Sequence, residues 1–573
     1  MKKELLSLVE SQRGSLSPLL FSQVFAASCV WVKLENESTF SNPDLLFEEF
    51  ICNEILSSYL LLDYEFPVQV SWIEKLKFSL NALLSTGVIN YQDLSDAIIE
   101  LVDQSGKYSS EIDIPTEVVE LGVKLLNKKI STVYCPFTSG YLFAHKIGSY
   151  DYAACETANM TDAFFGRIQT LLLDQNVNIV VSDPIKTPTL IGEGGLQQFD
   201  SAIALPPFGV KYGKDEIHDI WGRFPEKSLM GDVYHLRHLL AHSDYVVCFV
   251  TNGFLFRTAA GEKQFKQDMI EHNWLKAVIS LPSNLLSNTS IPISLVILDK
   301  NKSDDCVTFI DATSDHFIDK VSRVKYKLIN IDSILTMVAS NKDSQYCKHS
   351  CALDIQHNDY NLSPSRYTKT PEEIEAECFL SQFKTSKLSD LTDIIRPQAI
   401  NHDENGTNKF IEHNLTSLNN FGQLVGEGKP IFVSAENIKK ALKQTIKPKD
   451  VLISCRGAVG RIALVDSEIK ENILASQAFA IVRIKPDVEG ITSESLYQYL
   501  ISKHGQVMLS VYVTGTTAQM LNAKDLGDID IPLFKQDKLD ELYSIRIQTI
   551  NYQKKISQIK DEIINLNSNW VNS

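Results

Sequence analysis

The chain has 573 residues, more than one hydrophobic core usually organises, so its length predicts about two to four domains. Hydrophobic residues make up 44% and charged residues 22% of the sequence, which excludes the disordered and fibrous classes. No apolar run approaches the ~20 residues of a membrane-spanning helix, and acidic residues interrupt the apolar part of the N-terminus. We therefore expect a cytoplasmic protein with neither a membrane span nor a secretory signal.

The net charge of −16 is unevenly distributed along the chain. From Phe379 to the end there are 23 basic and 22 acidic residues, whereas the residues before Phe379 carry a net charge of −17. DNA binding depends on the local clustering of charge rather than on the total. The charge thus permits DNA binding by the C-terminal third without establishing it.

The sequence of the first two thirds of the chain predicts three segments. Residues 1–120 have helical spacing and predict a helical N-terminal domain. Residues 121–335 alternate short apolar runs, such as VNIVVSD and YVVCFVT, with spacers of helix length. This alternation predicts a doubly wound, Rossmann-like parallel α/β sheet, whose ligands bind at the carboxyl ends of the strands. Residues 336–378 form a polar connector.

The last third predicts two segments. Residues 379–535 contain strand-like runs separated by glycines and predict an α+β domain. Residues 536–573 form an amphipathic helix, with apolar residues at Leu539, Leu542, Ile545, Ile556, Ile559, Ile563 and Leu566. A helix of this kind needs a partner helix. The fold class is therefore multidomain α/β with a long C-terminal helix.

The 10 cysteines include no CxxC pair, which fits reduced thiols in a cytosolic protein. Cys347, His349 and Cys351 lie close enough in sequence to form one corner of a metal site. A second pair of ligands at suitable spacing is missing, so no metal site is expected.

Three predicted strand ends carry distinctive sequences, which are CPFTSGY from Cys135, Asp183-Pro184, and LPPFG from Leu205. Their order resembles the modification subunit of type I restriction-modification systems, the adenine-N6 DNA methyltransferases. FDSAIALPPFG is similar to the family's strand that ends in Asn-Pro-Pro-Phe-Gly. The segment 250–302 and the sequence YNLSPSRY also resemble family segments in the same order.

The last third is similar to half of a type I specificity subunit, with one target-recognition domain at 379–535 and one spacer helix at 536–573. The resemblance rests on KLSDLTDIIRP, KPKDVLISCRGAVGRIALV and TGTTAQMLNAKDLGDIDIPLFKQDKLDEL. It implies that the domain reads one half of a bipartite DNA site. The alternative is a β-rich accessory domain with a dimerisation helix. Candidate DNA contacts by residue type are Arg456, Arg461, Lys503, Thr514, Thr516 and Thr517.

The resemblance places the catalytic positions at Leu205, Pro206, Pro207 and Phe208. In the family, the Asn or Asp side chain before the prolines and a proline carbonyl accept hydrogen bonds from the adenine amino group, and the aromatic ring stacks on the flipped base. Leu205 offers no acceptor. An unpaired amino hydrogen in a dry pocket costs about 1 to 3 kcal/mol, before any loss of transition-state stabilisation.

The resemblance implies S-adenosylmethionine as the cofactor, with contacts from Cys135, Phe137, Ser139, Gly140, Glu156 and Asp183. The family's loop reads like Asp-Pro-Phe-Cys-Gly-Ser-Gly, but Cys135 replaces the acid, Ser139 the first glycine and Tyr141 the last. A β-carbon is penalised where φ must be positive. Glu156 falls near the acid that would hold the ribose, and Asp183 near the one that would hold the adenine. Either is alternatively a solvated loop acid or a helix N-cap.

Three interpretations follow. The chain is an impaired methyltransferase that clamps DNA, or an active divergent enzyme that uses the Pro206 carbonyl, Phe208, Glu156 and Asp183, or an oligomeric scaffold whose C-terminal helix binds protein. Because catalysis needs the acceptor and the cofactor together, the first interpretation is favoured. The expected partners are double-stranded DNA and a second copy or another subunit on the C-terminal helix.

The chain has no GxxxxGK[ST] phosphate loop. A nuclease or translocase activity is therefore expected from a separate subunit. The family suggests a role in phage defence.

Overall fold

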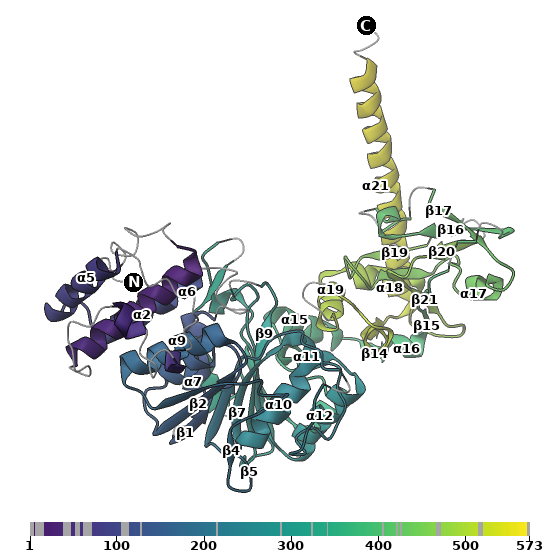
Figure 1. Cartoon of the computed structure of the whole chain (residues 1–573). Helices are drawn as coiled ribbons and strands as arrows, with labels where there is room; N and C mark the ends of the chain where they lie inside the picture. Colours follow the sequence, from purple (N-terminus) through teal and green to yellow (C-terminus); the bar gives the residue numbers. More distant parts are fainter. Residues whose placement is uncertain are drawn as a thin grey trace. The chain divides into compact units, whose positions relative to one another are not determined.

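The computed structural model of the chain describes residues 5, 16–37, 47–51, 58–60, 72–104, 114–126, 129–213, 216–286, 289–322, 325–340, 342–400, 402–403, 406–419, 422–424, 427–465, 472–513 and 519–569. The chain forms two compact units, Met1–Thr368 and Lys369–Ser573 (Figure 1). The five segments predicted from the sequence remain a prediction. Among the described helices, none combines the length and the apolarity needed to cross a membrane.

The first unit is built on a nine-stranded sheet with the order β13-β10-β8-β9-β7-β6-β1-β2-β3. Its strands are β1 (Thr132–Tyr134), β2 (Tyr152–Thr157), β3 (Val177–Val181), β6 (Ser201–Ala204), β7 (Tyr245–Thr251), β8 (Leu275–Ser280), β9 (Ile293–Asp299), β10 (Cys306–Asp311) and β13 (Cys347–Cys351). Two short hairpins add β4 (Ile191–Gly192) with β5 (Gly195–Leu196), and β11 (Ile318–Lys320) with β12 (Tyr326–Leu328).

The sheet is mostly parallel, as predicted, with two exceptions. Strand β9 is antiparallel to β7 and β8, and β13 is antiparallel to β10. Residues 281–292 join β8 to β9, and the described part of this connection contains no helix. A parallel crossover needs a longer connection that is usually helical, whereas an antiparallel neighbour does not. The mixed α/β class predicted from the sequence is confirmed.

Helices cover both faces of this sheet. They are α2 (Pro18–Asn36), α3 (Phe47–Ile51), α5 (Ile73–Ser85), α6 (Tyr91–Gln104), α7 (Thr116–Lys124), α8 (Gly140–Lys146), α9 (Met160–Leu173), α10 (Gly231–His242), α11 (Asn252–Phe256), α12 (Ala260–Glu271), α13 (Ile331–Ala339) and α14 (Ala352–His357). Successive strand residues face opposite sides. Val247 and Phe249 lie in the core that includes α7, α8 and α9, whereas Val246 and Cys248 lie in the core that includes α10 and α12.

The N-terminal helices pack onto the same core as the sheet. Helix α2 is almost entirely buried, and its Lys33 is only 1% exposed. The ammonium group of Lys33 donates hydrogen bonds to the carbonyls of Leu171 (2.8 Å) and Leu172 (3.1 Å), in the last turn of α9. A cation at this position also opposes the partial negative charge of the helix end. This contact ties the N-terminal helices to the sheet layer.

The chain reverses its direction across the sheet between β1 and β6. From β1 it continues outward through β2 to β3, and it then returns to β6 on the other side of β1. In parallel sheets, such a switch point leaves a crevice at the carboxyl ends of the two central strands. The loops that follow β1 and β6 are CPFTSG and LPPFG, so the fold brings these two predicted loops to one edge.

The second unit has an α+β fold. Its sheets have the orders β15-β21-β18-β19, β17-β16-β20 and β14-β22. Their strands are β14 (Lys384–Lys387), β15 (Thr392–Ile395), β16 (Asn408–His413), β17 (Lys429–Val433), β18 (Val451–Ser454), β19 (Ile462–Leu464), β20 (Ile473–Ala475), β21 (Phe479–Ile484) and β22 (Asp530–Leu533). The helices are α15 (Pro371–Leu380), α16 (Leu388–Leu391), α17 (Ile438–Lys443), α18 (Ser493–Ile501), α19 (Lys503–Val511), α20 (Ala523–Gly527) and α21 (Gln536–Asn569).

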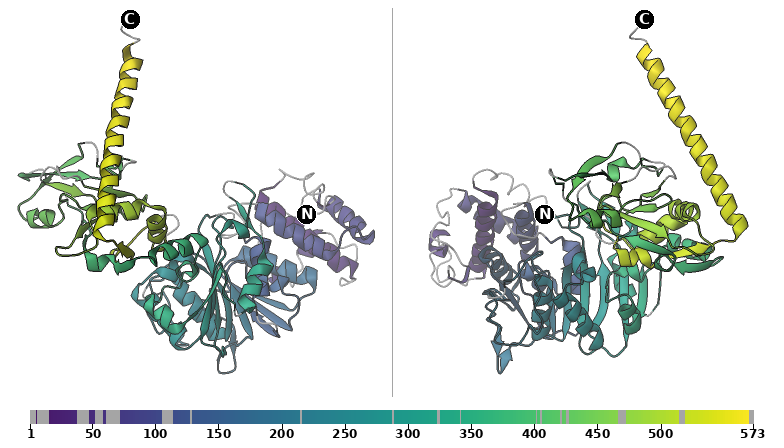
Figure 2. Two further views of the ribbon diagram at one scale, coloured as in Figure 1. Left: turned by 180° about the vertical axis from the view of Figure 1, so that it is seen from behind. Right: turned by 90° about the vertical axis from the view of Figure 1, so that its right-hand side faces the viewer.

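Helix α21 confirms the long C-terminal helix predicted from the sequence and has 34 residues. Its first half packs on α18 and buries Leu539, Arg546 and Gln553. Its second half extends beyond the sheets of its own unit (Figure 2). There the apolar side chains are exposed, from 40% at Ile556 to 71% at Leu566.

Candidate active site

A pocket of about 420 Å³ lies at the carboxyl edge of the strands β1, β2, β3 and β6. Its lining residues are Phe137, Thr138, Ala158, Asn159, Asp183, Pro184, Pro207 and Tyr212. Three residues predicted from the sequence, Phe137, Asp183 and Pro207, are therefore brought together from three different strand ends. The other site residues predicted in the loops after β1 and β6 are not among the lining residues of this pocket.

The loop after β1 is tightly folded. Phe137 and Ser139 have φ angles of 71° and 62°, in the left-handed region that penalises side chains with a β-carbon. The Phe137 N–H donates to the Glu156 carbonyl (2.8 Å). A β-carbon on Gly140 would lie 2.1 Å from the carbonyl oxygen of Cys135, so the loop can close onto α8 only with glycine there.

Asp162 supports this loop from beneath, and sequence reasoning missed it. Its carboxylate accepts a hydrogen bond from the Ser139 N–H (2.8 Å), and the side chain is only 6% exposed. Burial raises the pKa of Asp162 to about 7, against the lowering effect of its hydrogen bonds. The spacing of Asn159 and Asp162 is that of a helix cap, and Asn159 does accept from the Asp162 N–H (3.0 Å). That signal locates the start of α9 but not the contact with the loop.

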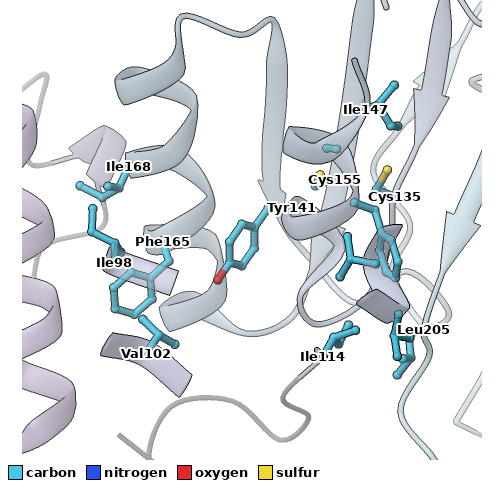
Figure 3. Packing of buried hydrophobic residues seen from close by; sticks show 14 of the residues in the cluster. Ile98, Val102, Ile114, Cys135, Tyr141, Ile147, Cys155, Phe165, Ile168 and Leu205 are labelled. Carbon is cyan, nitrogen blue, oxygen red and sulfur yellow. The ribbon is translucent and has the colours of Figure 1, made fainter. Parts of the chain in front are cut away.

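Cys135 and Leu205 face the apolar core rather than the pocket. Cys135 is 0% and Leu205 1% exposed, and both belong to the core beneath the N-terminal helices. Figure 3 shows them among the buried apolar side chains of that core, together with Cys155 and Tyr141. Phe208 is half-buried against the same core. Neither Cys135 nor Leu205 presents a polar group to a ligand.

Glu156 is fully buried at the carboxyl end of β2. Its Oε1 accepts hydrogen bonds from the hydroxyl of Ser182 (2.5 Å) and from the N–H (2.7 Å) and hydroxyl (2.9 Å) of Thr189. Its Oε2 accepts one from the hydroxyl of Tyr134 (2.7 Å). Both carboxylate oxygens are thus engaged by the chain itself, and Glu156 does not line the pocket.

The hydrogen bonds around Tyr134 run in one direction. Burial, with the neighbouring Glu156 as the second cause, raises the pKa of Tyr134 well above its usual range, so its hydroxyl donates to Glu156. The hydroxyl oxygen then accepts from Nε2–H of His238 (2.8 Å), and Nδ1 of His238 accepts from Nη1 of Arg223 (3.0 Å). Burial lowers the pKa of His238 well below its usual range, which agrees with this neutral tautomer. The four side chains form one buried chain of donors and acceptors.

Asp183 lies in the pocket wall and accepts two backbone hydrogen bonds from the turn that follows it. Its Oδ1 accepts hydrogen bonds from the N–H groups of Ile185 (2.9 Å) and Lys186 (3.0 Å). Arg223 holds the same turn by donating to the carbonyls of Pro184 (3.0 Å) and Ile185 (2.8 Å). Asp183 therefore caps the turn and is half-buried at the pocket surface.

The six residues expected to contact DNA have different surroundings. Thr514, Thr516 and Thr517 lie outside the described residues. The guanidinium group of Arg461 donates to the backbone carbonyls of Leu415 (3.2 Å), Leu418 and Asn419 (3.4 Å), which holds the preceding loop. Lys503 forms an ion pair with Glu375 (2.7 Å). Arg456 is exposed on the turn after β18.

Comparison with known families accounts for this arrangement. Residues 97–376 match the N-6 DNA methylase family, and residues 381–569 match the type I restriction modification DNA specificity domain. The chain carries an N-6 DNA methylase domain followed by a type I restriction modification DNA specificity domain. The nine-stranded sheet with its pocket lies in the methylase domain, and α21 lies in the specificity domain.

Curated relatives match the methylase domain at low identity. The type I restriction enzyme MpnII methylase subunit of Mycoplasma pneumoniae is 27% identical over 220 residues, which are 35% of this chain and 39% of that protein. The type I restriction enzyme MjaVII methylase subunit of Methanocaldococcus jannaschii is 25% identical over 334 residues, which are 52% of this chain and 57% of that protein. The chain thus spans only 39% to 57% of the length of these relatives.

A solved structure also matches part of the chain at low sequence identity. The methyltransferase subunit of a type I restriction-modification system from Streptococcus thermophilus is 23% identical, with a TM-score of 0.47. The match covers 59% of this chain and 79% of that one.

Two of the residues expected to hold S-adenosylmethionine, Phe137 and Asp183, line the pocket. The acid expected for its ammonium group is the buried thiol of Cys135, and the acid expected for its ribose, Glu156, is engaged by Ser182, Thr189 and Tyr134. The remaining pocket offers Asp183 beside Phe137, two proline rings and a tyrosine. Such a site suits a flat ring with a hydrogen-bond donor, as in the adenine part of S-adenosylmethionine, and Asp183 is the one carboxylate among its described lining residues.

Proposed function

We propose that the chain is a sequence-specific DNA-binding protein, in which the specificity domain selects the site and a catalytically impaired methylase domain holds the duplex. The DNA-binding part rests on the match of residues 97–376 and 381–569 to two DNA-directed families. The relatives are named as methylase subunits of type I restriction enzymes, so the proposed setting is DNA modification and phage defence, with cleavage by a separate nuclease or translocase subunit.

The observation that carries the impairment is the burial of Leu205 in apolar surroundings. A base amino group would find the carbonyl of a proline but no side-chain acceptor at this strand end. The hydrogen bonds that Glu156 accepts from three other residues of the chain support the same conclusion for the cofactor. The two losses compound, because methyl transfer needs the acceptor and the cofactor in one geometry.

Calorimetric titration of S-adenosylmethionine into the protein, with and without duplex DNA, tests this proposal. We expect no binding in the micromolar range in either state, and no methyl transfer to DNA. The Leu205→Asn variant should stay inactive, since the new amide replaces a core side chain while Cys135 and Glu156 are unchanged. Micromolar binding and methylation by the unaltered chain would instead establish the divergent enzyme.

The divergent enzyme is the second candidate because the pocket keeps some of the expected groups. Phe137, Asp183 and Pro207 all line it. In that case the Pro206 carbonyl and Phe208 would act on the base, and Asp183→Asn would weaken S-adenosylmethionine binding. An unchanged dissociation constant in Asp183→Asn would count against this candidate.

We also propose that α21 pairs with a second copy of the chain. One specificity domain reads one half of a split site, so a two-fold dimer would read a palindrome. Exposed apolar residues along the second half of the helix support a partner there. Sedimentation should give the mass of a dimer, and Ile559→Glu with Ile563→Glu should give a monomer. A monomeric mass for the unaltered chain, with and without DNA, would refute the pairing.

The third candidate is a scaffold whose α21 binds another protein. The same exposed residues, from Ile556 to Leu566, favour it. Co-purification with a partner that survives nuclease treatment, together with no retention of DNA at low salt, would select this candidate over DNA binding.

A further inference from the structure

The specificity domain carries a short segment with an unusual density of exposed lysines. Lys439, Lys440 and Lys443 lie on α17, and Lys447 and Lys449 lie on the turn that follows it. All five are exposed. We call these five residues the lysine segment.

The backbone of the lysine segment is well anchored. Ala441 is fully buried in a small core with Phe410 and Ile431, so α17 is packed on the three-stranded sheet β17-β16-β20. After the helix, the side chain of Gln444 exchanges hydrogen bonds with the N–H (2.8 Å) and carbonyl (2.9 Å) of Gln398. The lysines therefore project from a fixed support, which lowers the entropy cost of binding a ligand.

The positive charge of the segment is not neutralised locally. Within the described part of the chain, none of the five lysines is within ion-pair distance of a carboxylate, whereas Lys387, Lys503 and Lys538 of the same unit each form such a pair. The adjacent Asp450 is only 1% exposed, and Arg483 holds it through two hydrogen bonds (2.8 and 2.7 Å). Lys440 donates to the Ala399 carbonyl (3.0 Å), which leaves its charge uncompensated.

We propose that the lysine segment is a phosphate-contacting surface for duplex DNA, a step that rests on the DNA binding proposed above. Two of the cations first expected to serve DNA are engaged inside the unit, Arg461 with backbone carbonyls and Lys503 with Glu375. In the described part of the unit, four lysines of the segment have no such engagement, and Lys440 has only its hydrogen bond to the Ala399 carbonyl. Lysines act on phosphates as mobile point charges and carry no base preference of their own. The segment positions the domain on DNA, and other groups read the sequence.

The test compares two triple variants of the full chain. The first is Lys439→Gln, Lys443→Gln and Lys447→Gln, and the matched control is Lys369→Gln, Lys384→Gln and Lys538→Gln, which removes the same charge elsewhere in the unit. Binding of a fluorescent random-sequence duplex is measured by anisotropy over a series of salt concentrations. Thermal unfolding of both variants confirms that the fold is kept.

The expected result is a weaker dependence of DNA affinity on salt concentration in the first variant only. Each lost phosphate contact lowers the slope of log affinity against log salt by about 0.9, so three contacts lower it by about 2.7 and weaken binding about a hundredfold at physiological salt. An unchanged slope, or an equal change in both variants, would overturn the assignment of the surface while leaving DNA binding intact. Absence of binding by the unaltered chain would instead remove the proposed function on which this inference rests.

Discussion

Replacing Glu156 by glutamine tests whether this carboxylate belongs to the fold or serves a ligand. The carboxylate accepts four hydrogen bonds, from Ser182, from two groups of Thr189, and from Tyr134. An amide group keeps one acceptor oxygen and turns a second position into a donor. If the oxygen stays with Ser182 and Thr189, the new N–H₂ group faces Tyr134, whose hydroxyl proton then has no acceptor because His238 already donates to its oxygen.

The expected cost combines two effects. An orphaned buried donor costs about 1 to 3 kcal/mol, and each remaining hydrogen bond weakens by about 1 kcal/mol when its acceptor loses charge. The lower desolvation cost of a neutral amide offsets part of this loss. We therefore expect Glu156→Gln to lower the free energy of unfolding by about 3 kcal/mol.

Urea unfolding followed by tryptophan fluorescence provides the measurement. Four of the five tryptophans lie within residues 1–368, so the signal reports mainly on the unit that contains Glu156. Asp183→Asn is the matched control, because asparagine caps a turn about as well as aspartate and the change should cost less than about 1 kcal/mol. A Glu156→Gln variant with the stability of the unaltered chain would refute the reasoning and would return this carboxylate to the ligand.

Three further outcomes are expected. Gly140→Ala should lower the unfolding free energy by about 3 kcal/mol in urea, because its β-carbon would lie 2.1 Å from the Cys135 carbonyl oxygen; an unchanged midpoint would contradict the loop geometry. The pKa of Asp162, raised to about 7, makes the native state bind the extra proton, so its contribution to stability should be present below about pH 4 and lost as the pH rises to 7. The stability difference between Asp162→Asn and the unaltered chain should follow that window, and a pH-independent difference would exclude the shift. Arg461→Ala should destabilise the specificity domain, whereas Arg456→Ala should leave its melting temperature unchanged and weaken DNA binding; the reverse pattern would make Arg461 a DNA contact.

The parallel sheet could be predicted because the apolar runs and the spacer lengths that indicate it are local features of the sequence. Apolar runs separated by spacers of helix length give parallel strands, and the same rule applied to residues 281–292 would have given the antiparallel β9. Leu205 could also be assessed from the sequence, since a leucine side chain has no acceptor in any environment.

The burial of Glu156 and its hydrogen-bond partners could not be predicted in this way. Its partners come from three separate places in the chain, and a buried acid looks the same in sequence as a solvated one. Arg456 and Arg461 raise the same difficulty, because both lie in one glycine-containing turn region. Only the approach of the carbonyls from Leu415 to Asn419 distinguishes the arginine that holds the fold from the exposed one.

The burial of Leu205 also bears on whether substitutions could restore catalysis under the proposed impairment. Leu205 and Cys135 help to join the sheet to the helices beneath it, so the positions that a methyltransferase would use for chemistry now contribute to stability. A polar side chain restored at either position would lose apolar contacts and add an uncompensated group to a dry core, at a cost of about 2 kcal/mol or more for each. Under the proposed impairment, each single step toward the family's sequence would be uphill, so recovery of catalysis would need coordinated changes in two strands and in the helices that cover them.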